Sequence, residues 1–274
     1  MTGLDKPRIE LLAFDLDGTV LDDHFEISPR VRQAVRGAVS RGVRVTIATG
    51  RPLPVIRPFY AALGVNAPVL AMQGGLIYDF ASEKVLHELT LPGDLACALM
   101  ELESRRPAWQ AVLFVGDSVH VSAVRYPPKF YASLLGANLT VDADLCAVIA
   151  RRDPDKVLFV IPPEDAEESL RELQRISAGR ATVVQSHRLF VEVNPLDAHK
   201  GAGLARLAAD LNIPRERVMA IGDQDNDMTM IAWAGVGVAM GNASPATLAA
   251  ADWIAPPISA DGAAAAIERF ILLA

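Results

Sequence analysis

One stretch decides the fold of this chain, and it reads Ala13-Phe14-Asp15-Leu16-Asp17-Gly18-Thr19-Val20. The apolar run Ile9–Phe14 predicts a buried strand, and two aspartates follow at its carboxyl end. Ligands of open α/β sheets bind where parallel strands end, so this position suits a functional site. Gly18 permits a sharp turn there. The alternative is an Asp-Gly turn between two hairpin strands, and this stretch alone leaves both interpretations open.

Strands and helices alternate on both sides of a long central segment. The first part predicts strands at 9–14, 43–48 and 68–72, with one helix from Ser28-Pro29 and another from Pro52 or Pro54. The second part predicts helices at 198–211, 227–234, 245–250 and 262–273 and strands at 218–221 and 236–239. This alternation predicts an α/β fold with a Rossmann-like parallel sheet core and helices on both faces.

The central segment has a different pattern. It mixes predicted strands at 110–115, 119–124, 157–161, 181–185 and 189–193 with helices at 94–105, 130–135 and 164–177. Such an order predicts an antiparallel α+β domain inserted into the first one. We expect residues 1–90 and 191–274 to form the core and residues 91–190 to form the insertion, with crossings near Leu89 and Val193.

The composition narrows the class of protein. The chain has 274 residues, of which 33 are acidic and 26 basic, so its net charge is -7. This charge argues against a nucleic-acid or anionic-membrane partner. Cys97 and Cys146 lie far apart and outside any CxxC pattern, so we predict neither a disulfide framework nor a thiolate metal site. The N-terminus lacks a signal-peptide pattern and no apolar run could span a bilayer, so we expect a soluble, cytoplasmic protein.

Three later motifs favour function over a turn at Asp15 and Asp17. They are Ala48-Thr49-Gly50-Arg51, Lys200-Gly201 and Gly222-Asp223-Gln224-Asp225-Asn226-Asp227. In order and spacing, the motifs resemble those of the haloacid dehalogenase (HAD) superfamily. The last motif looks like that of the Cof-type phosphatases, which carry a large inserted α/β cap (type IIB). The resemblance covers nearly the whole chain and implies that residues 91–190 are this cap.

The resemblance also implies roles for the aspartates. Asp15 is the expected nucleophile, which forms an aspartyl-phosphate. Asp17 is the expected acid that protonates the leaving oxygen and then the base that activates water. The implied cofactor is Mg²⁺, held by the Asp15 and Asp223 carboxylates and the main-chain carbonyl of Asp17, with Asp227 ordering its waters. Mg²⁺ favours such oxygen ligands.

Other residue types in these motifs suit a phosphate group. Thr49 offers a hydroxyl and Gly50 an unobstructed amide at a strand-to-helix junction, and Lys200 supplies a compact cation. Arg51 can form a fork with phosphate or contact the acidic residues, and Asn226 can bind phosphate or water or stabilise a turn. The family usually has Asn where this chain has Gln73, so we expect an altered contact near the phosphate pocket.

The acidic run from Asp223 to Asp227 partly matches other known motifs, but none of these motifs is complete in this chain. An EF-hand loop begun at Asp223 would need Gly at Met228 and Glu at Ala234, and no dinucleotide fingerprint or P-loop follows a predicted strand. In the insertion, Arg125 and Lys129 rank first as cations for a phosphorylated or acidic substrate. Trp109, His120, Tyr126, His187 and Arg188 are further candidates, although such residues are more often structural.

We therefore expect a Mg²⁺-dependent enzyme that hydrolyses a small phosphorylated metabolite, such as a sugar phosphate or a nucleotide-related phosphomonoester. Two alternatives stay open. One is a phosphotransferase or phosphomutase on the same scaffold, and the other is a non-catalytic module that binds metal or phosphate. We expect no nucleic acid or membrane among its partners, and a monomer or a homodimer.

Overall fold

The computed structural model describes residues 8–127, 129–131 and 139–273. Its first sheet has the strand order β14-β13-β12-β1-β2, and every pair in it is parallel. The strands are β1 (Leu11–Phe14), β2 (Arg44–Ile47), β12 (Val218–Gly222), β13 (Val236–Ala239) and β14 (Trp253–Ile254). All residues of β1 are buried, as expected for a central strand covered on both faces. The predicted Rossmann-like parallel core is confirmed.

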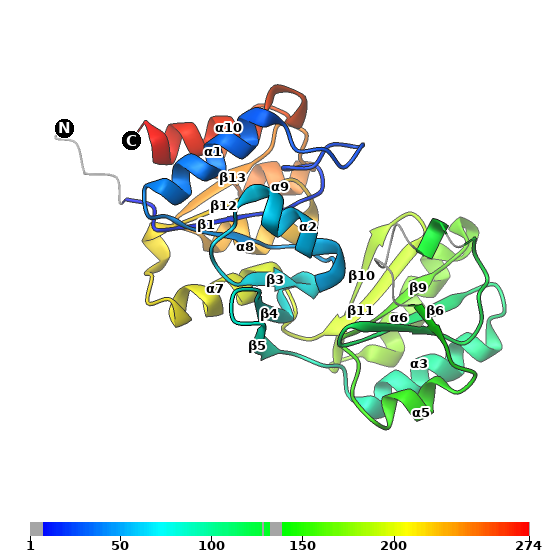
Figure 1. Cartoon of the computed structure of the whole chain (residues 1–274). Helices are drawn as coiled ribbons and strands as arrows, with labels where there is room; N and C mark the ends of the chain where they lie inside the picture. The colour runs from blue at the N-terminus through cyan, green and yellow to red at the C-terminus, as the bar shows by residue number, and fades with distance from the viewer. Residues whose placement is uncertain (1–7, 128, 132–138, 274) are drawn as a thin grey trace. The chain divides into compact units, whose positions relative to one another are not determined.

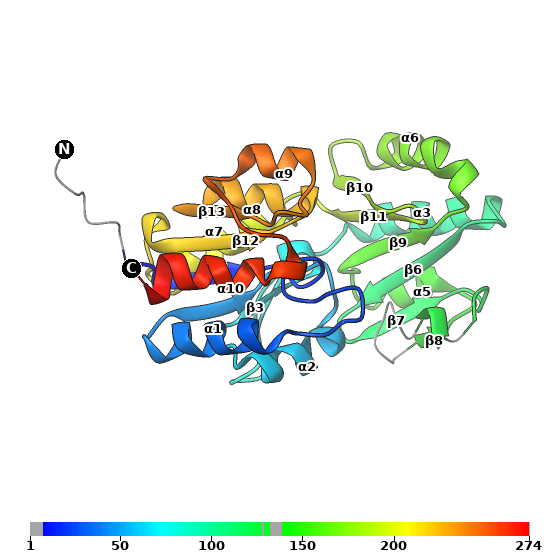
Figure 2. The same cartoon turned by 90° about the horizontal axis from the view of Figure 1, so that it is seen from above.

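Helices cover both faces of this sheet (Figure 2). They are α1 (Pro29–Ser40), α2 (Leu53–Leu63), α7 (Lys200–Asp210), α8 (Met228–Trp233), α9 (Pro245–Ala250) and α10 (Gly262–Ile267), which continues as a π-helix over Glu268–Leu272. Leu11 and Ala13 of β1 pack with Leu204 of α7 and Ile231 of α8. Because side chains alternate along a strand, Leu12 points to the opposite face, where α1 and α10 lie side by side.

The third predicted strand does not extend the parallel sheet as expected. β3 (Val69–Ala71) forms a separate sheet with β4 (Leu76–Asp79) and β5 (Lys84–Glu88), and a single parallel bridge joins Ala48 to Leu70. At the turn after β3, Met72 and Gln73 adopt φ values of 50° and 59°. This left-handed backbone reverses the chain, so β4 pairs with β3 in antiparallel fashion.

The described chain divides into two compact units. The first runs to Gly50 and includes Ile56–Leu86 and the chain from His199, and the second contains Arg51–Val55 and His87–Ala198. The second unit therefore includes the described residues of 91–190 and, in addition, Arg51–Val55, which contains the first residues of α2. Figure 1 shows the elements of each unit in sequence colours.

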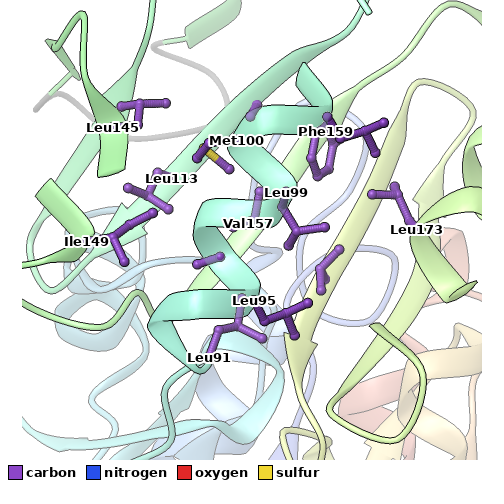
Figure 3. Packing of buried hydrophobic residues seen from close by; sticks show 14 of the residues in the cluster. Leu91, Leu95, Leu99, Met100, Leu113, Leu145, Ile149, Val157, Phe159 and Leu173 are labelled. Carbon is purple, nitrogen blue, oxygen red and sulfur yellow. The ribbon is translucent and has the colours of Figure 1, made fainter. Parts of the chain in front are cut away.

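The second unit is a mixed sheet covered by helices. Its strand order is β10-β11-β9-β6-β7-β8, antiparallel except for the β7–β8 pair. The strands are β6 (Gln110–Val115), β7 (Ser118–Val121), β8 (Leu139–Val141), β9 (Lys156–Val160), β10 (Ala181–His187) and β11 (Phe190–Pro195), and the helices are α3 (Gly93–Arg105), α5 (Leu145–Ile149) and α6 (Ala166–Ser177). Figure 3 shows its core, where Leu95, Leu99 and Met100 of α3 lie against Leu113 and Val157.

The sequence predicted this unit less well between residues 119 and 155. The strand predicted for 119–124 ends at Val121, and the short elements β8 and α5 were not predicted. The helix predicted for 130–135 lies mainly outside the described residues, since only 129–131 are described there. A cap explains the start of α5, because the Asp144 side chain accepts a hydrogen bond of 3.0 Å from the amide of Ala147.

Candidate active site

The candidate site lies at the carboxyl ends of three neighbouring strands. In the sheet, Phe14 at the end of β1 is in register with Ile47 of β2 and Ile221 of β12. The residues that follow these strands therefore meet at one edge of the sheet. They include Asp15, whose amide donates a hydrogen bond of 3.0 Å to the carbonyl of Ile221, and Asp223.

Three buried carboxylates form the centre of the site. Asp15, Asp223 and Asp227 each offer an oxygen atom, and these oxygens all lie within 4.8 Å of one another. Asp227 Oδ2 accepts hydrogen bonds from the amides of Asp223 at 2.9 Å and Gln224 at 3.0 Å. Its side chain therefore holds the loop after β12 in place as well as contributing charge.

Lys200 lies between two of these carboxylates. Its Nζ is 2.7 Å from Asp15 Oδ1 and 2.6 Å from Asp227 Oδ1, and its side chain is completely buried. The position follows from the start of α7, where His199 Nδ1 accepts a hydrogen bond of 3.1 Å from the amide of Ala202. Lys200 is the first residue of that helix, so its ammonium group lies beside the ends of β1 and β12.

Burial, together with repulsion among the carboxylates, disfavours the charged forms of Asp15 and Asp223. Burial raises the pKa of Asp15 to about 8, with Lys200 opposing the rise and the carboxylates of Asp227 and Asp17 adding to it. Burial also raises the pKa of Asp223 to about 6, against the hydrogen bonds that Gln224 and Thr19 donate. Burial alone would lower the pKa of Lys200, but the adjacent carboxylates raise it, so the lysine stays charged.

The donor set fits a divalent cation. Within the part of the chain that the structure describes, Asp15, Asp223 and Asp227 are the one group of side chains arranged to share a metal ion. All three are carboxylates, the ligands that hard cations such as Mg²⁺, Mn²⁺ and Ca²⁺ prefer. One ammonium group among three carboxylates leaves negative charge that a cation would offset, and the Asp227 carboxylate adds to the burial that raises the pKa values of Asp15 and Asp223.

Two glycines allow the loops to approach so closely. Gly18 has φ 74°, and a side chain there would overlap the Asp223 carboxylate. At Gly222, a Cβ would meet the side chain of Asp227. Asp17, next to Gly18, is half-buried and lies outside the group of three carboxylates. Its expected metal contact is through the main-chain carbonyl.

The residues expected to bind phosphate continue the same edge of the sheet. Thr49 is buried, and its carbonyl accepts a hydrogen bond of 3.1 Å from the amide of Gln73. Gln73 in turn accepts one of 3.0 Å from Asn226 Nδ2, and a Cβ at Gly50 would lie 2.5 Å from Gln73 Nε2. The Gln73 side chain thus connects the loops after β2 and β12. Arg51 is half-buried and starts the segment that belongs to the second unit.

The sequence did not predict the side chains that support the acidic group. Thr19 Oγ1 donates a hydrogen bond of 3.0 Å to Asp223 Oδ1, and Gln224 Nε2 donates one of 2.8 Å to Asp223 Oδ2. Asn242 Nδ2 donates one of 2.9 Å to the carbonyl of Gly18. Thr19 and Gln224 belong to the motifs, so their positions could have identified them from the sequence. No motif contains Asn242, and its partner Gly18 is distant in sequence.

The two candidates from the insertion have different surroundings within the second unit. Arg125 Nη1 donates a hydrogen bond of 3.0 Å to the carbonyl of Pro107 and another to that of Trp109, and Nη2 lies 3.4 Å from Glu103 Oε1. These contacts hold the guanidinium group against its own unit. Lys129 is exposed. Trp109 is buried in the core, as the structural alternative predicted.

The fold and this site define a Rossmann-like protein with a cation-accepting acidic centre at the carboxyl edge of its sheet. The family model of haloacid dehalogenase-like hydrolases matches residues 12–267. The 5-amino-6-(5-phospho-D-ribitylamino)uracil phosphatase YcsE of Bacillus subtilis is 31% identical over 269 residues, which cover 96% of this chain and 96% of YcsE. A solved haloacid dehalogenase-like hydrolase from Bacteroides thetaiotaomicron aligns with a TM-score of 0.87 and 31% identity, covering 96% of this chain and 99% of that one.

A third likeness concerns the fold alone. The HAD subclass IIB sugar phosphatase BT4131 aligns with a TM-score of 0.80 at 22% identity, covering 95% of this chain and 98% of that one. The chain belongs to the haloacid dehalogenase-like hydrolases, and the predicted resemblance to Cof-type phosphatases is confirmed. It is an enzyme of the phosphatase class. No helix among the residues that the structure describes is long and apolar enough to cross a membrane.

Proposed function

We propose that this chain is a Mg²⁺-dependent phosphomonoesterase that acts on a small phosphorylated metabolite, such as a sugar phosphate or a nucleotide-related compound. One observation carries the proposal. A buried lysine lies 2.7 Å and 2.6 Å from two of three clustered carboxylates at the ends of β1 and β12. Such a centre supplies an anionic nucleophile together with positive charge, and phosphoryl transfer needs both.

In this proposal, Asp15 attacks the phosphorus atom with a carboxylate oxygen. The bond from phosphorus to the ester oxygen breaks, and Asp17 donates its proton to that leaving oxygen. A water molecule then attacks the aspartyl-phosphate, Asp17 removes its proton, and phosphate leaves with Asp15 restored. Gly18, next to Asp17, lies against the Asp223 carboxylate, which supports this assignment because it places the Asp17 loop beside the acidic centre.

The surrounding residues would bind and orient the phosphoryl group. Lys200 neutralises charge on the phosphoryl oxygens, while the Thr49 hydroxyl and the Gly50 amide donate hydrogen bonds to them. Asn226 and Arg51 contribute further donors. Asn226 is oriented by its hydrogen bond to Gln73, so Gln73 acts on the substrate through it.

Asp15, Asp223 and the main-chain carbonyl of Asp17 would hold Mg²⁺, with Asp227 beside them. When bound, the cation would offset the negative charge of the site and of the phosphate ester. We further propose that residues 91–190 form the cap that selects the substrate, with Arg125 and Lys129 as its first candidates. Hinges near Leu89 and Val193 would allow this cap to exclude water.

A phosphate-release screen of the full chain tests the proposal. The panel contains sugar phosphates, ribityl phosphates and nucleoside monophosphates, each with Mg²⁺ and with EDTA. We expect release only with Mg²⁺, and a loss of more than about 10³-fold in Asp15→Asn and Asp223→Asn. Asp210→Asn, an exposed aspartate at the end of α7, is the matched control and should keep full activity. Turnover in excess EDTA, or by folded Asp15→Asn protein, would refute the mechanism.

A further inference from the structure

A cavity lies at the opposite end of the first unit's sheet from Asp15. Its volume is about 800 Å³, and the residues that precede or begin β1, β2, β13 and β14 line it together with the end of the C-terminal helix. The active-site residues follow the carboxyl ends of β1, β2 and β12 in the same parallel sheet, so the two sites are separated by the length of the strands. A cavity of a few hundred to about 1,000 Å³ is the usual size for a small-molecule site.

The charged groups that line this cavity are mainly arginines. Arg8, Arg41 and Arg269 line it, and Asp252 is the one carboxylate among its lining residues. Asp252 Oδ2 already accepts a hydrogen bond of 2.8 Å from the amide of Gly237. In the described part of the chain, none of these arginines forms an ion pair. Their charge is therefore available to a ligand, although the whole chain has a net charge of -7.

Two of the arginines are held in position by the main chain. Arg8 Nη2 donates a hydrogen bond of 2.8 Å to the carbonyl of Arg41, and Arg41 Nη1 donates one of 2.6 Å to the carbonyl of Ile271. A guanidinium group has five N–H donors, so these bonds orient each group and leave further donors for an anion. Such an oriented fork suits the oxygens of a phosphate group.

The third arginine belongs to an aromatic wall. The Arg269 guanidinium lies 5.2 Å from the Trp253 ring centroid and 5.4 Å from that of Phe270. The two rings meet edge to face, with centroids 5.5 Å apart. Because Arg269 lies over the indole and is itself exposed, a planar base can stack on its guanidinium plane with the two rings behind it, so this wall suits an aromatic ligand.

We propose that this cavity binds a nucleotide-class ligand, with its phosphate on Arg8 and Arg41 and its base against Trp253 and Arg269. Three guanidinium groups and one carboxylate leave a charge that matches a phosphomonoester dianion. The arginines and the aromatic wall together favour a ligand that has both a phosphate and a base. An apolar ligand would need no arginines, and an inorganic anion would need no aromatic wall. The proposal goes beyond the phosphatase site and does not depend on turnover.

Calorimetric titration of the full chain with AMP in EDTA tests it, and adenosine and inorganic phosphate serve as the two half-ligand probes. We expect saturable one-to-one binding of AMP, with each half-ligand at least about tenfold weaker. Arg269→Gln and Arg8→Gln should each weaken AMP binding by about tenfold, the usual effect of losing a charge-assisted contact. Trp253→Phe should remove the change in tryptophan fluorescence that AMP causes.

Two variants separate this cavity from the phosphatase site. Arg32→Gln, an exposed arginine of α1 outside the cavity, should leave AMP affinity unchanged. Asp15→Asn should also leave it unchanged. The proposal is wrong if about 5 mM AMP gives no binding heat. It is equally wrong if Arg269→Gln and Arg8→Gln bind as well as the parent, or if Asp15→Asn abolishes binding, since AMP would then occupy the acidic site.

Discussion

Replacement of Lys200 by methionine should destabilise the metal-free protein strongly. Methionine has a similar length and no charge, so the change leaves Asp15 and Asp227 buried without their ammonium partner. Removing one partner of a buried ion pair costs about 3–5 kcal/mol, because the remaining charge is desolvated and unpaired. For a folded unit of this size, such a loss corresponds to a fall in Tm of roughly 6–20 °C.

The loss should depend on pH and on metal. Without the ammonium group, the pKa of Asp15 in the folded state rises further above its unfolded value, so the variant loses stability as pH rises. The difference from the parent should therefore grow as the pH rises above about 8, where Asp15 ionises in the folded parent. Mg²⁺ should restore part of it, because a cation bound to the carboxylates replaces some of the missing positive charge.

Thermal and denaturant unfolding, each with EDTA and with Mg²⁺, measure these effects. The matched control is Lys156→Met in the second unit, where a buried lysine lies 3.3 Å from Glu192. It should also destabilise, but Mg²⁺ should not reverse its effect. If Lys200→Met protein were as stable as the parent in EDTA at pH 7.5, the charged arrangement at the site would be incorrect. Equal rescue of both variants would show a nonspecific effect of the cation.

Three further predictions concern the same loops. Asp17→Asn should lower steady-state turnover of an alkyl phosphate by about 10²–10⁴-fold, yet give a burst of phenolate with an aryl phosphate. Near-normal turnover of both substrates would instead favour a turn-forming role for Asp17. In EDTA, the free energy of unfolding of the parent, measured by denaturant titration, should fall from pH 5 to pH 9. The reason is that the folded-state pKa values of Asp15 (about 8) and Asp223 (about 6) lie above the unfolded value of 3.8. A rise in stability over this range would contradict those shifts. Gly18→Ala should weaken Mg²⁺ binding, measured by calorimetry, by at least about tenfold, because the added methyl group overlaps the Asp223 carboxylate and the residue must keep a strained positive φ. The control is Gly42→Ala, which has a similar φ with open space around it and should bind the ion normally.

Local sequence patterns were sufficient for most of the core. The apolar run before Asp15, the Ser28-Pro29 helix start and the regular alternation of strands and helices each depend on neighbours a few residues apart. Ser28 does cap α1, with its Oγ accepting a hydrogen bond of 3.1 Å from Val31. The resemblance of the four motifs to those of the haloacid dehalogenase superfamily also grouped Asp15, Thr49, Lys200 and Asp223 as candidates.

Features that depend on the turn between elements could not be predicted in this way. The left-handed pair Met72 and Gln73 directs the chain after β3 into an antiparallel hairpin, and two non-glycine residues give no warning of that backbone. The elements β8 and α5 are too short to show a clear period, so only their packing against the rest of the second unit defines them.

The residue types of the site, and the strand ends that carry them, were determined by the sequence. Only the tertiary structure decided their electrostatics. Lys200 is 185 positions from Asp15, and its sequence motif predicted a cation for the site without showing that it is buried. In the fold it is completely buried between the carboxylates of Asp15 and Asp227, because helix α7 begins beside the ends of β1 and β12. Burial and charge coupling arise from contacts between distant segments, and no local pattern encodes them.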